Sequence, residues 1–311
     1  MTFTPADYQQ RATQEILSCN LCGASRFRTI AMRDRLGFPV ESVMCDQCSL
    51  IWISPRMDPA GYAWFYESGT YREMVYSAMK VEDHAAELAT SQENYAKLIE
   101  GVLTPFLEPL KGQTLLDMGG STGIIAARLR DKFGVVPIVV DPSREEIAKA
   151  AGRGLRTQHA TIDSYTPTQP FAAVCLFQTV EHLMDVQAGL AKLRSFMRVD
   201  GLLLIDACDV RWNMVRQKSV ARAMKLDHPF ALTDPVMRAY LARAGFVVWK
   251  RFQMTDGSIV RKWLYVCGRC DPQPWAIPDE NDLLEMRELV RRCIGWDKLR
   301  EGDAKHAHLS V

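Results

Sequence analysis

Four cysteines near the amino terminus have the types and spacing of a metal site. Cys19 and Cys22 form one Cys-x-x-Cys pair, and Cys45 and Cys48 form a second. Two such turns can place four thiolates around one ion in the tetrahedral geometry that Zn²⁺ prefers. Four protein ligands leave no open coordination position, so we expect a structural zinc ion, with four unligated buried cysteines as the alternative.

Two histidines could exchange a proton near neutral pH. His182 comes after the apolar run Ala172–Phe177, directly behind Glu181, and His228 follows the run Gly201–Ala207 after a long loop. Open α/β sheets bind ligands beyond the carboxyl ends of their strands, where both histidines would lie. His182, His228 and Glu181 are therefore the candidate catalytic residues, although each histidine could instead pack beneath a ligand or order a loop.

A glycine-rich turn could hold a nucleotide. Asp117, Gly119, Ser121 and Gly123 lie between an apolar run and a helix-like segment, and glycines allow a tight turn that approaches a ligand closely. Asp141 ends the next apolar run, where a carboxylate can accept hydrogen bonds from both hydroxyls of a ribose. The turn does not match the G-x-G-x-x-G pattern of NAD enzymes, and its early acidic residue favours a ligand that carries an amino group.

These residues need a framework of alternating strands and helices. The expected strands are 114–118, 135–140, 172–177, 201–207, 246–252 and 263–267, and the expected helices are 123–133, 143–151, 186–197 and 234–244. Such alternation predicts an α/β fold with a Rossmann-like, doubly wound, mostly parallel sheet. We expect a zinc-ribbon-like module at 1–58, a helical linker or lid at 59–112 closed by Pro105 and Pro109, the α/β domain at 113–270 and a helical extension at 271–311.

Composition limits the possible partners. The 311 residues carry 38 Lys and Arg against 37 Asp and Glu, so a net charge of +1 gives no basic excess for a nucleic-acid partner. No apolar run is long enough to span a membrane, and the amino terminus lacks the pattern of a secretory signal. We expect a cytoplasmic protein with a small-molecule partner, while the oligomeric state is left open.

The chain resembles the class I methyltransferases that use S-adenosylmethionine. Asp117, Gly119 and Gly123 match their first motif, in which Ser121 replaces a glycine. Further matches follow in order along residues 100–268: Asp141-Pro142, Thr161-Ile162-Asp163, Phe177-Gln178 leading to Glu181-His182, Phe196–Leu204, and Asp227–Phe230. The resemblance implies seven strands and a cofactor site at Asp117, Gly119, Ser121, Gly123, Asp141, Pro142, Ile162, Asp163, Phe177 and Gln178.

Residues 18–75 resemble the zinc-binding module of some methyltransferases from sugar and polysaccharide pathways. The segment Cys45–Pro55, followed by Phe65-Tyr66 and Tyr71, carries this resemblance. It implies methyl transfer to a hydroxyl of a sugar, nucleotide-sugar or glycan precursor. Methylation of carbon or nitrogen, and a degenerate methyltransferase that serves as a binding or scaffold partner, are the alternatives.

Overall fold

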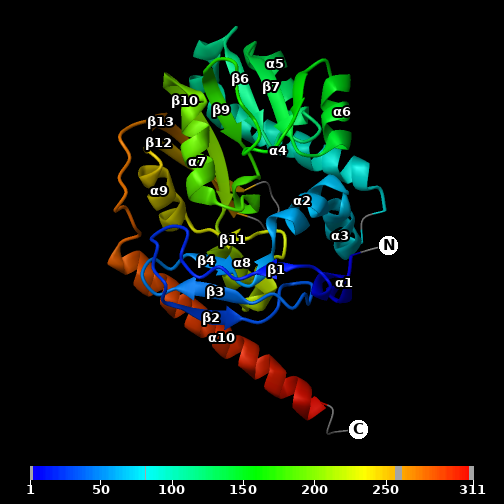
Figure 1. Cartoon of the computed structure of the whole chain (residues 1–311), viewed down its shortest axis with the longest axis vertical. Coiled ribbons are helices and arrows are strands. Elements are labelled where there is room, and N and C mark those ends of the chain that lie inside the picture. The colour runs from blue at the N-terminus through cyan, green and yellow to red at the C-terminus, as the bar shows by residue number, and fades with distance from the viewer. Residues whose placement is uncertain (1–2, 81, 256–260, 308–311) are drawn as a thin grey trace.

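A seven-stranded sheet fills the upper half of the molecule in Figure 1. The computed structural model describes residues 3–80, 82–255 and 261–307. The strands are β6 (Thr114–Met118), β7 (Val136–Asp141), β8 (Arg156–His159), β9 (Phe171–Leu176), β10 (Met197–Cys208), β12 (Phe246–Thr255) and β13 (Arg261–Arg269). Their order is β12-β13-β10-β9-β6-β7-β8, with β13 antiparallel to both neighbours and the pairs from β10 to β8 parallel. The predicted α/β class and mostly parallel sheet are confirmed.

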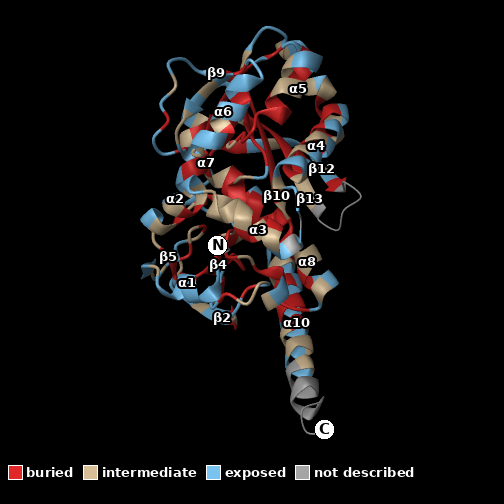
Figure 2. Ribbon diagram, turned by 90° about the vertical axis from the view of Figure 1, so that its right-hand side faces the viewer, coloured by how far each residue is buried: buried red, intermediate tan, exposed pale blue. Residues whose placement is uncertain are grey.

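Helices cover both faces of this sheet. The helices are α4 (His84–Leu107), α5 (Ile124–Phe133), α6 (Arg144–Gly152), α7 (Val186–Ser195) and α9 (Asp234–Arg243). One apolar cluster joins α4 and α5 to the sheet, and another joins α7 and α9 to it. In Figure 2 the buried residues follow the strands between these layers. Both faces are therefore sealed, which leaves the strand ends as places for a ligand.

Three details differ from the sequence prediction. β8 was not expected, because its residues Arg156–His159 are polar and alternate between exposed and half-buried at the sheet edge. Pro105 does not end its helix, since α4 continues to Leu107 before the 3-10 turn η1 (Glu108–Leu110). Within the expected helical extension at 271–311, the helix α10 begins only at Glu280 and runs to Ala307, and residues 308–311 lie outside the described residues.

The cysteine-rich segment forms a second, four-stranded sheet. β2 (Phe27–Ala31), β3 (Ser42–Cys45) and β4 (Ile51–Ile53) are antiparallel neighbours, and β11 (Phe230–Ala231) completes the order β11-β4-β3-β2. The short strands β1 (Thr13–Gln14) and β5 (Arg56–Met57) pair beside it, after α1 (Pro5–Gln9). Because β11 comes from the loop after β10, the large domain supplies one strand of the small sheet.

The remaining helices lie around this junction. They are α2 (Pro59–Glu67), α3 (Thr70–Met79) and α8 (Val210–Gln217), with the 3-10 turns η2 (Val180–His182) and η3 (Ala221–Ala223). α10 packs Met286 and Leu289 in one cluster with Met214 of α8 and Ile51 of β4, and its far end projects from the body in Figure 1. Among the helices of the described residues, none combines the length and apolar character that a membrane span requires.

Candidate active site

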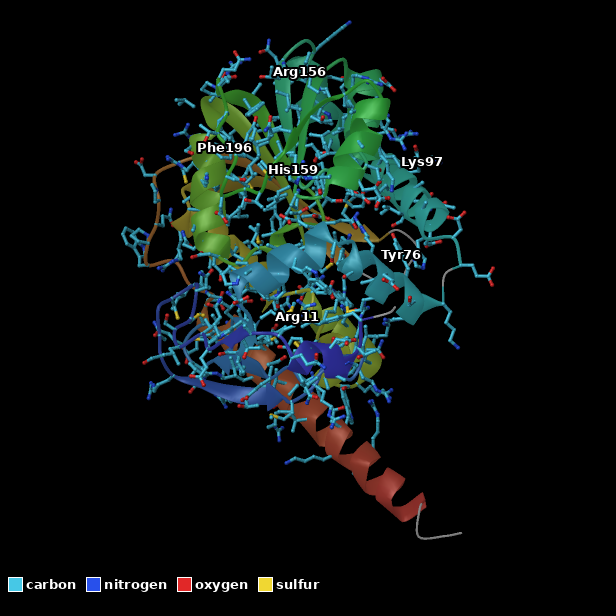
Figure 3. The ribbon with its side chains drawn as sticks, turned by 45° about the vertical axis from the view of Figure 1, so that its right-hand side comes forward. Arg11, Tyr76, Lys97, Arg156, His159 and Phe196 are labelled. Atoms are coloured by element: carbon cyan, nitrogen blue, oxygen red, sulfur yellow. The ribbon has the colours of Figure 1, made fainter. Side chains whose placement is uncertain are left out.

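The carboxyl ends of the parallel strands face the cysteine module. In Figure 3, Arg156 at the start of β8 lies at the far end of the molecule, and His159 at its end lies toward α2 and α3. The turns after β6, β7, β9 and β10 therefore meet at the junction between the two sheets. The predicted cofactor and catalytic residues follow these strands.

The turn after β6 has the backbone that its glycines allow. Gly119 has φ +73° and Gly123 has φ +72°, a region that side chains rarely adopt. A Cβ atom at Gly119 would lie 2.6 Å from Thr179 Oγ1, and one at Gly123 would lie 2.6 Å from Leu155 Cδ1. Larger residues would displace these neighbours and close the cradle.

Ser121 takes the place of a glycine at a positive φ of 51°. Its N–H donates to Asp141 Oδ2 at 3.0 Å, and its hydroxyl donates to the carboxylate of Glu146. Nη2 of Arg72, from α3, donates to Ser121 Oγ at 3.2 Å. Ser121, which replaces a glycine of the family motif, thus joins the turn to both α6 and α3.

Two carboxylates flank this turn. Asp117 is 1% exposed, and its Oδ2 has no hydrogen-bond partner. Burial, followed by the charge of Asp141, raises the pKa of Asp117 to about 7. Asp141 accepts from the N–H groups of Ser121 and Ser143, at 3.0 and 2.8 Å, which fixes its orientation at the end of β7. The unpartnered oxygen of Asp117 can accept a hydrogen bond from a cationic group.

The other predicted cofactor residues lie on neighbouring turns. The Pro142 carbonyl is 2.8 Å from His159 Nε2, Ile162 is buried in the core, and Asp163 is exposed. The ring of Phe177 packs against Tyr95 with centroids 6.0 Å apart. Gln178 has φ +52°, and its N–H donates to Asp206 Oδ1 at 2.5 Å. These contacts determine the shape of the turns after β7, β8 and β9.

His182 and His228 lie together beyond β9 and β10. Their ring centroids are 4.8 Å apart at an interplanar angle of 84°. His182 Nδ1 is 2.7 Å from the carbonyl oxygen of Asp227, and His228 Nε2 is 3.4 Å from Asp227 Oδ2. Because a carbonyl only accepts, the proton of neutral His182 belongs on Nδ1, which leaves the lone pair on Nε2.

Both imidazoles are held in the neutral form. Burial lowers the pKa of His182, against the opposing charges of Asp227 and Glu181. Burial and then the charge of Lys225 hold the pKa of His228 well below its usual value. A neutral imidazole can accept a proton, so this pair meets the first requirement for a general base.

Glu181 occupies a different position from the one expected for a group that exchanges protons. Its side chain is 2% exposed, and Oε1 accepts from the Cys208 N–H at 2.6 Å. The carboxylate therefore ties η2 to the end of β10.

Aromatic side chains from α2 and α3 cover His182. The Tyr66 hydroxyl donates to the Asp227 carbonyl at 3.0 Å and lies 3.0 Å from His182 Nδ1. The ring centroid of Tyr71 is 5.5 Å from that of His182. Sequence reasoning had not assigned a role to Asp227, although its position directly before His228 was the available signal.

The cysteine module holds the segment that carries His228. We name residues 224–231 the His228 loop. The Ile53 N–H donates to the Pro229 carbonyl at 3.1 Å, and Phe230 pairs with Trp52 in the β11–β4 ladder. The Leu226 N–H donates to Asp34 Oδ2 at 3.0 Å. Two segments of the module therefore fix the backbone of the His228 loop, one through backbone hydrogen bonds and the other through the Asp34 carboxylate.

The four cysteines of the module converge. Cys19 Sγ and Cys48 Sγ are 3.4 Å apart, and Cys22 Sγ and Cys45 Sγ are 3.6 Å apart. All four sulfurs lie within 4.8 Å of one another. These distances exclude disulfides and resemble the separation of about 3.8 Å that Zn–S bonds of about 2.3 Å give in a tetrahedron.

The strand order and the glycine turn define a Rossmann-like nucleotide-binding domain. A family profile described as a methyltransferase domain matches residues 91–251, and the chain belongs to this family. A ubiquinone biosynthesis O-methyltransferase from Bradyrhizobium diazoefficiens is 28% identical over 112 residues, which are 34% of this chain and 44% of that protein. The match thus spans less than half of that relative.

Two solved structures share the fold. One is the 1,6-didemethyltoxoflavin-N1-methyltransferase of Burkholderia thailandensis with 1,6-didemethyltoxoflavin and S-adenosylhomocysteine (TM-score 0.51, 14% identity, 73% of this chain and 97% of that one). The other is the magnesium protoporphyrin IX methyltransferase of Synechocystis PCC 6803 with S-adenosylhomocysteine (TM-score 0.52, 12% identity, 68% and 98%). At these identities the likeness concerns the fold.

Proposed function

We propose that this protein transfers a methyl group from S-adenosylmethionine to a hydroxyl of a small acceptor, namely a sugar, nucleotide-sugar or glycan precursor. The observation that carries the proposal is the neutral, half-buried pair of His182 and His228 on the sheet edge that also bears the glycine turn. The O-methyltransferase relative supports oxygen as the acceptor atom. The resemblance of the cysteine module to those of sugar-pathway enzymes supports the acceptor class.

The residues of the turn suit S-adenosylmethionine. The unpartnered, buried Asp117 Oδ2 would accept from the amino group, and Asp141 at the end of β7 would accept from the ribose hydroxyls. Gly119 and Gly123 leave space that a Cβ atom would fill. When bound, the cofactor supplies a methyl group on a sulfonium that is already activated for displacement.

His228 would accept the proton of the acceptor hydroxyl. Its neutral form has a free lone pair, and the nearby Asp227 carboxylate would stabilise the imidazolium that results. His182 would receive a hydrogen bond from the acceptor at Nε2, since its Nδ1–H is held by the Asp227 carbonyl. Tyr66 and Tyr71 would help exclude water from this pair.

The cysteine cluster would hold a structural zinc ion. Four sulfurs at near-tetrahedral separations offer the ligand set that Zn²⁺ prefers. In support, Gln47 N–H donates to Cys45 Sγ at 3.3 Å, a contact that stabilises a thiolate. The ion would stabilise the module, and through β4 it would stabilise the His228 loop.

Calorimetry with S-adenosylhomocysteine tests the cofactor assignment. We expect saturable binding with one site per chain, and no binding at millimolar ligand would refute the proposal. A screen for transfer of labelled methyl groups then tests the acceptor class. Labelling of a nucleobase or an amine, with no hydroxyl compound labelled, would refute O-methylation.

A further inference from the structure

Two hollows of different size lie at the junction. One, lined by His228, Glu181, Lys225 and Ser42, has a volume of about 20 Å³, which suffices for roughly one water molecule. The other is an open groove of about 410 Å³ between residues of the cysteine module, α3, α8 and η3. Small-molecule sites range from about 300 to 1,000 Å³, so of these two hollows the groove is the one with room for part of an acceptor.

Two arginine side chains line the groove. Its lining residues are Arg35, Leu36, Ala78, Gln217 and Arg222, and both arginines are exposed. Within the described parts of the chain, neither guanidinium has an ion pair or a side-chain hydrogen bond. The nearby carboxylate of Asp34 is buried and accepts from three backbone N–H groups, those of Leu36, Phe38 and Leu226.

Backbone contacts hold the two arginine-bearing segments together. The Arg35 N–H donates to the Met224 carbonyl at 3.1 Å, two residues beyond Arg222. The Leu226 N–H donates to Asp34, one residue before Arg35. Two like charges are therefore brought to one groove from segments far apart in the sequence. Like charges repel, and a bound anion would offset this repulsion.

We propose that this groove binds a phosphate or diphosphate group of the acceptor through Arg35 and Arg222. Guanidinium groups are planar forks that match phosphate oxygens with paired hydrogen bonds. The inference rests on the proposed methyl transfer and specifies its substrate as a phosphorylated compound. It assigns the cysteine module a direct share in binding that substrate, because Arg35 belongs to the module.

The groove lies within electrostatic reach of the histidine pair. The charges of Lys225 and Arg35 both contribute to the low pKa of His228, after burial. Burial raises the pKa of Tyr71, which packs on His182, and the charge of Arg35 is among those that oppose this rise. An anion held at the groove would therefore lie within electrostatic reach of the proposed base, and it would weaken the effect of Arg35 on His228.

The experiment is calorimetry of inorganic pyrophosphate binding, with S-adenosylhomocysteine present and the full chain as the protein. We compare the wild type with Arg35→Ala/Arg222→Ala and with the control Arg216→Ala, an exposed arginine of α8 that does not line the groove. Loss of two charge-assisted contacts should weaken binding by at least about tenfold, and the control should match the wild type. Malonate, a dicarboxylate of similar size, is the second probe.

The results separate this inference from the proposed function. Pyrophosphate binding that is lost in the double variant, and tighter than malonate binding, supports the phosphate groove. No binding at millimolar pyrophosphate, equal binding by the double variant, or tighter binding of malonate would overturn it. Binding of S-adenosylhomocysteine in the same titration cell tests the methyltransferase assignment on its own. The variant Arg35→Lys/Arg222→Lys, which retains the charges, should recover part of the affinity.

Discussion

The two sides of the active site are built over different distances in the sequence. On the cofactor side, Ser121 bonds to Asp141 and Glu146, which lie 20 and 25 residues away. On the acceptor side, the Tyr66–His182 contact spans 116 residues and the Asp34–Leu226 contact spans 192. One side is a local β-turn-α unit, and the other is assembled from the cysteine module, α2–α3 and the His228 loop.

This difference assigns the cysteine module to the acceptor side. β4 of the module pairs with β11 of the His228 loop, whereas the glycine turn contacts α3 and α6. Damage to the module should therefore disturb His228 first and cofactor binding much less. Mutations on the two sides should therefore have separable effects.

Loss of the metal should have the largest effect. A structural zinc site contributes on the order of 10 kcal/mol or more of binding free energy to folding, so Cys45→Ser should unfold the module. The rate of amide hydrogen exchange should rise sharply in residues 26–56 and in the His228 loop. Calorimetry should still detect binding of S-adenosylhomocysteine. Cys270→Ser, outside the cluster, is the control, and purified wild type should contain about one zinc per chain. Simultaneous loss of cofactor binding would show that the two sides are not separable.

Removal of the proposed base should have the next largest effect. General-base catalysis contributes about 10²- to 10⁴-fold, so His228→Ala should lower kcat by that factor with the acceptor identified in the screen. The affinity for S-adenosylhomocysteine should stay within about twofold of the wild-type value, because His228 belongs to the acceptor side. His84→Ala provides the control at the start of α4. Wild-type turnover in His228→Ala would remove His228 from the reaction.

Local patterns made the cofactor side predictable. β6 has the predicted bounds of Thr114–Met118, and α6 lies within the expected helix 143–151 apart from its last residue, capped by the Ser143 hydroxyl that accepts from the Glu146 N–H. Apolar runs and capping residues act over a few positions, so a sequence displays them directly. The edge strand β8 was missed because its four polar residues bury too little to produce such a pattern.

The acceptor side was only partly predictable, because long-range pairing leaves no local pattern. His182 and His228 were named separately, yet nothing in the sequence placed their rings 4.8 Å apart. Arg211 forms an ion pair with Asp209, whose burial in the folded chain the sequence does not display. The two-residue strand β11 could not be recognised without its partner β4.

On the cofactor side, Asp141→Ala should cause a moderate loss of affinity for S-adenosylhomocysteine. The substitution removes the proposed ribose acceptor and leaves the Ser121 and Ser143 N–H groups without their partner. Each lost charge-assisted bond costs about 1.5–3 kcal/mol, so the affinity for S-adenosylhomocysteine should fall by about 10- to 100-fold. Pyrophosphate binding should be unchanged, which keeps the acceptor side as an internal control. The exposed Asp131 of α5, replaced by Ala, is the matched carboxylate control.

The smallest expected effect is a pH dependence of the affinity for S-adenosylhomocysteine, which arises on the cofactor side alone. Burial and Asp141 raise the pKa of Asp117 to about 7, so its carboxyl group is neutral below that pH and ionised above it. The ionised form binds an ammonium group better, and the affinity for S-adenosylhomocysteine should therefore rise several-fold between about pH 6 and pH 8. Asp117→Asn should flatten this rise, whereas His228→Gln should leave it intact.

The same group has the opposite effect on the free protein. Because the folded pKa of Asp117 lies above the unfolded value of 3.8, the folded state binds more protons between the two, and the free energy of unfolding should decrease as the pH rises through that interval. Cofactor binding should offset this loss, since an ammonium partner favours the ionised carboxylate. Thermal unfolding of the wild type and of Asp117→Asn, with and without S-adenosylhomocysteine, measures both effects. A pH profile of ligand stabilisation that is identical in the two proteins would place the amino group elsewhere than Asp117.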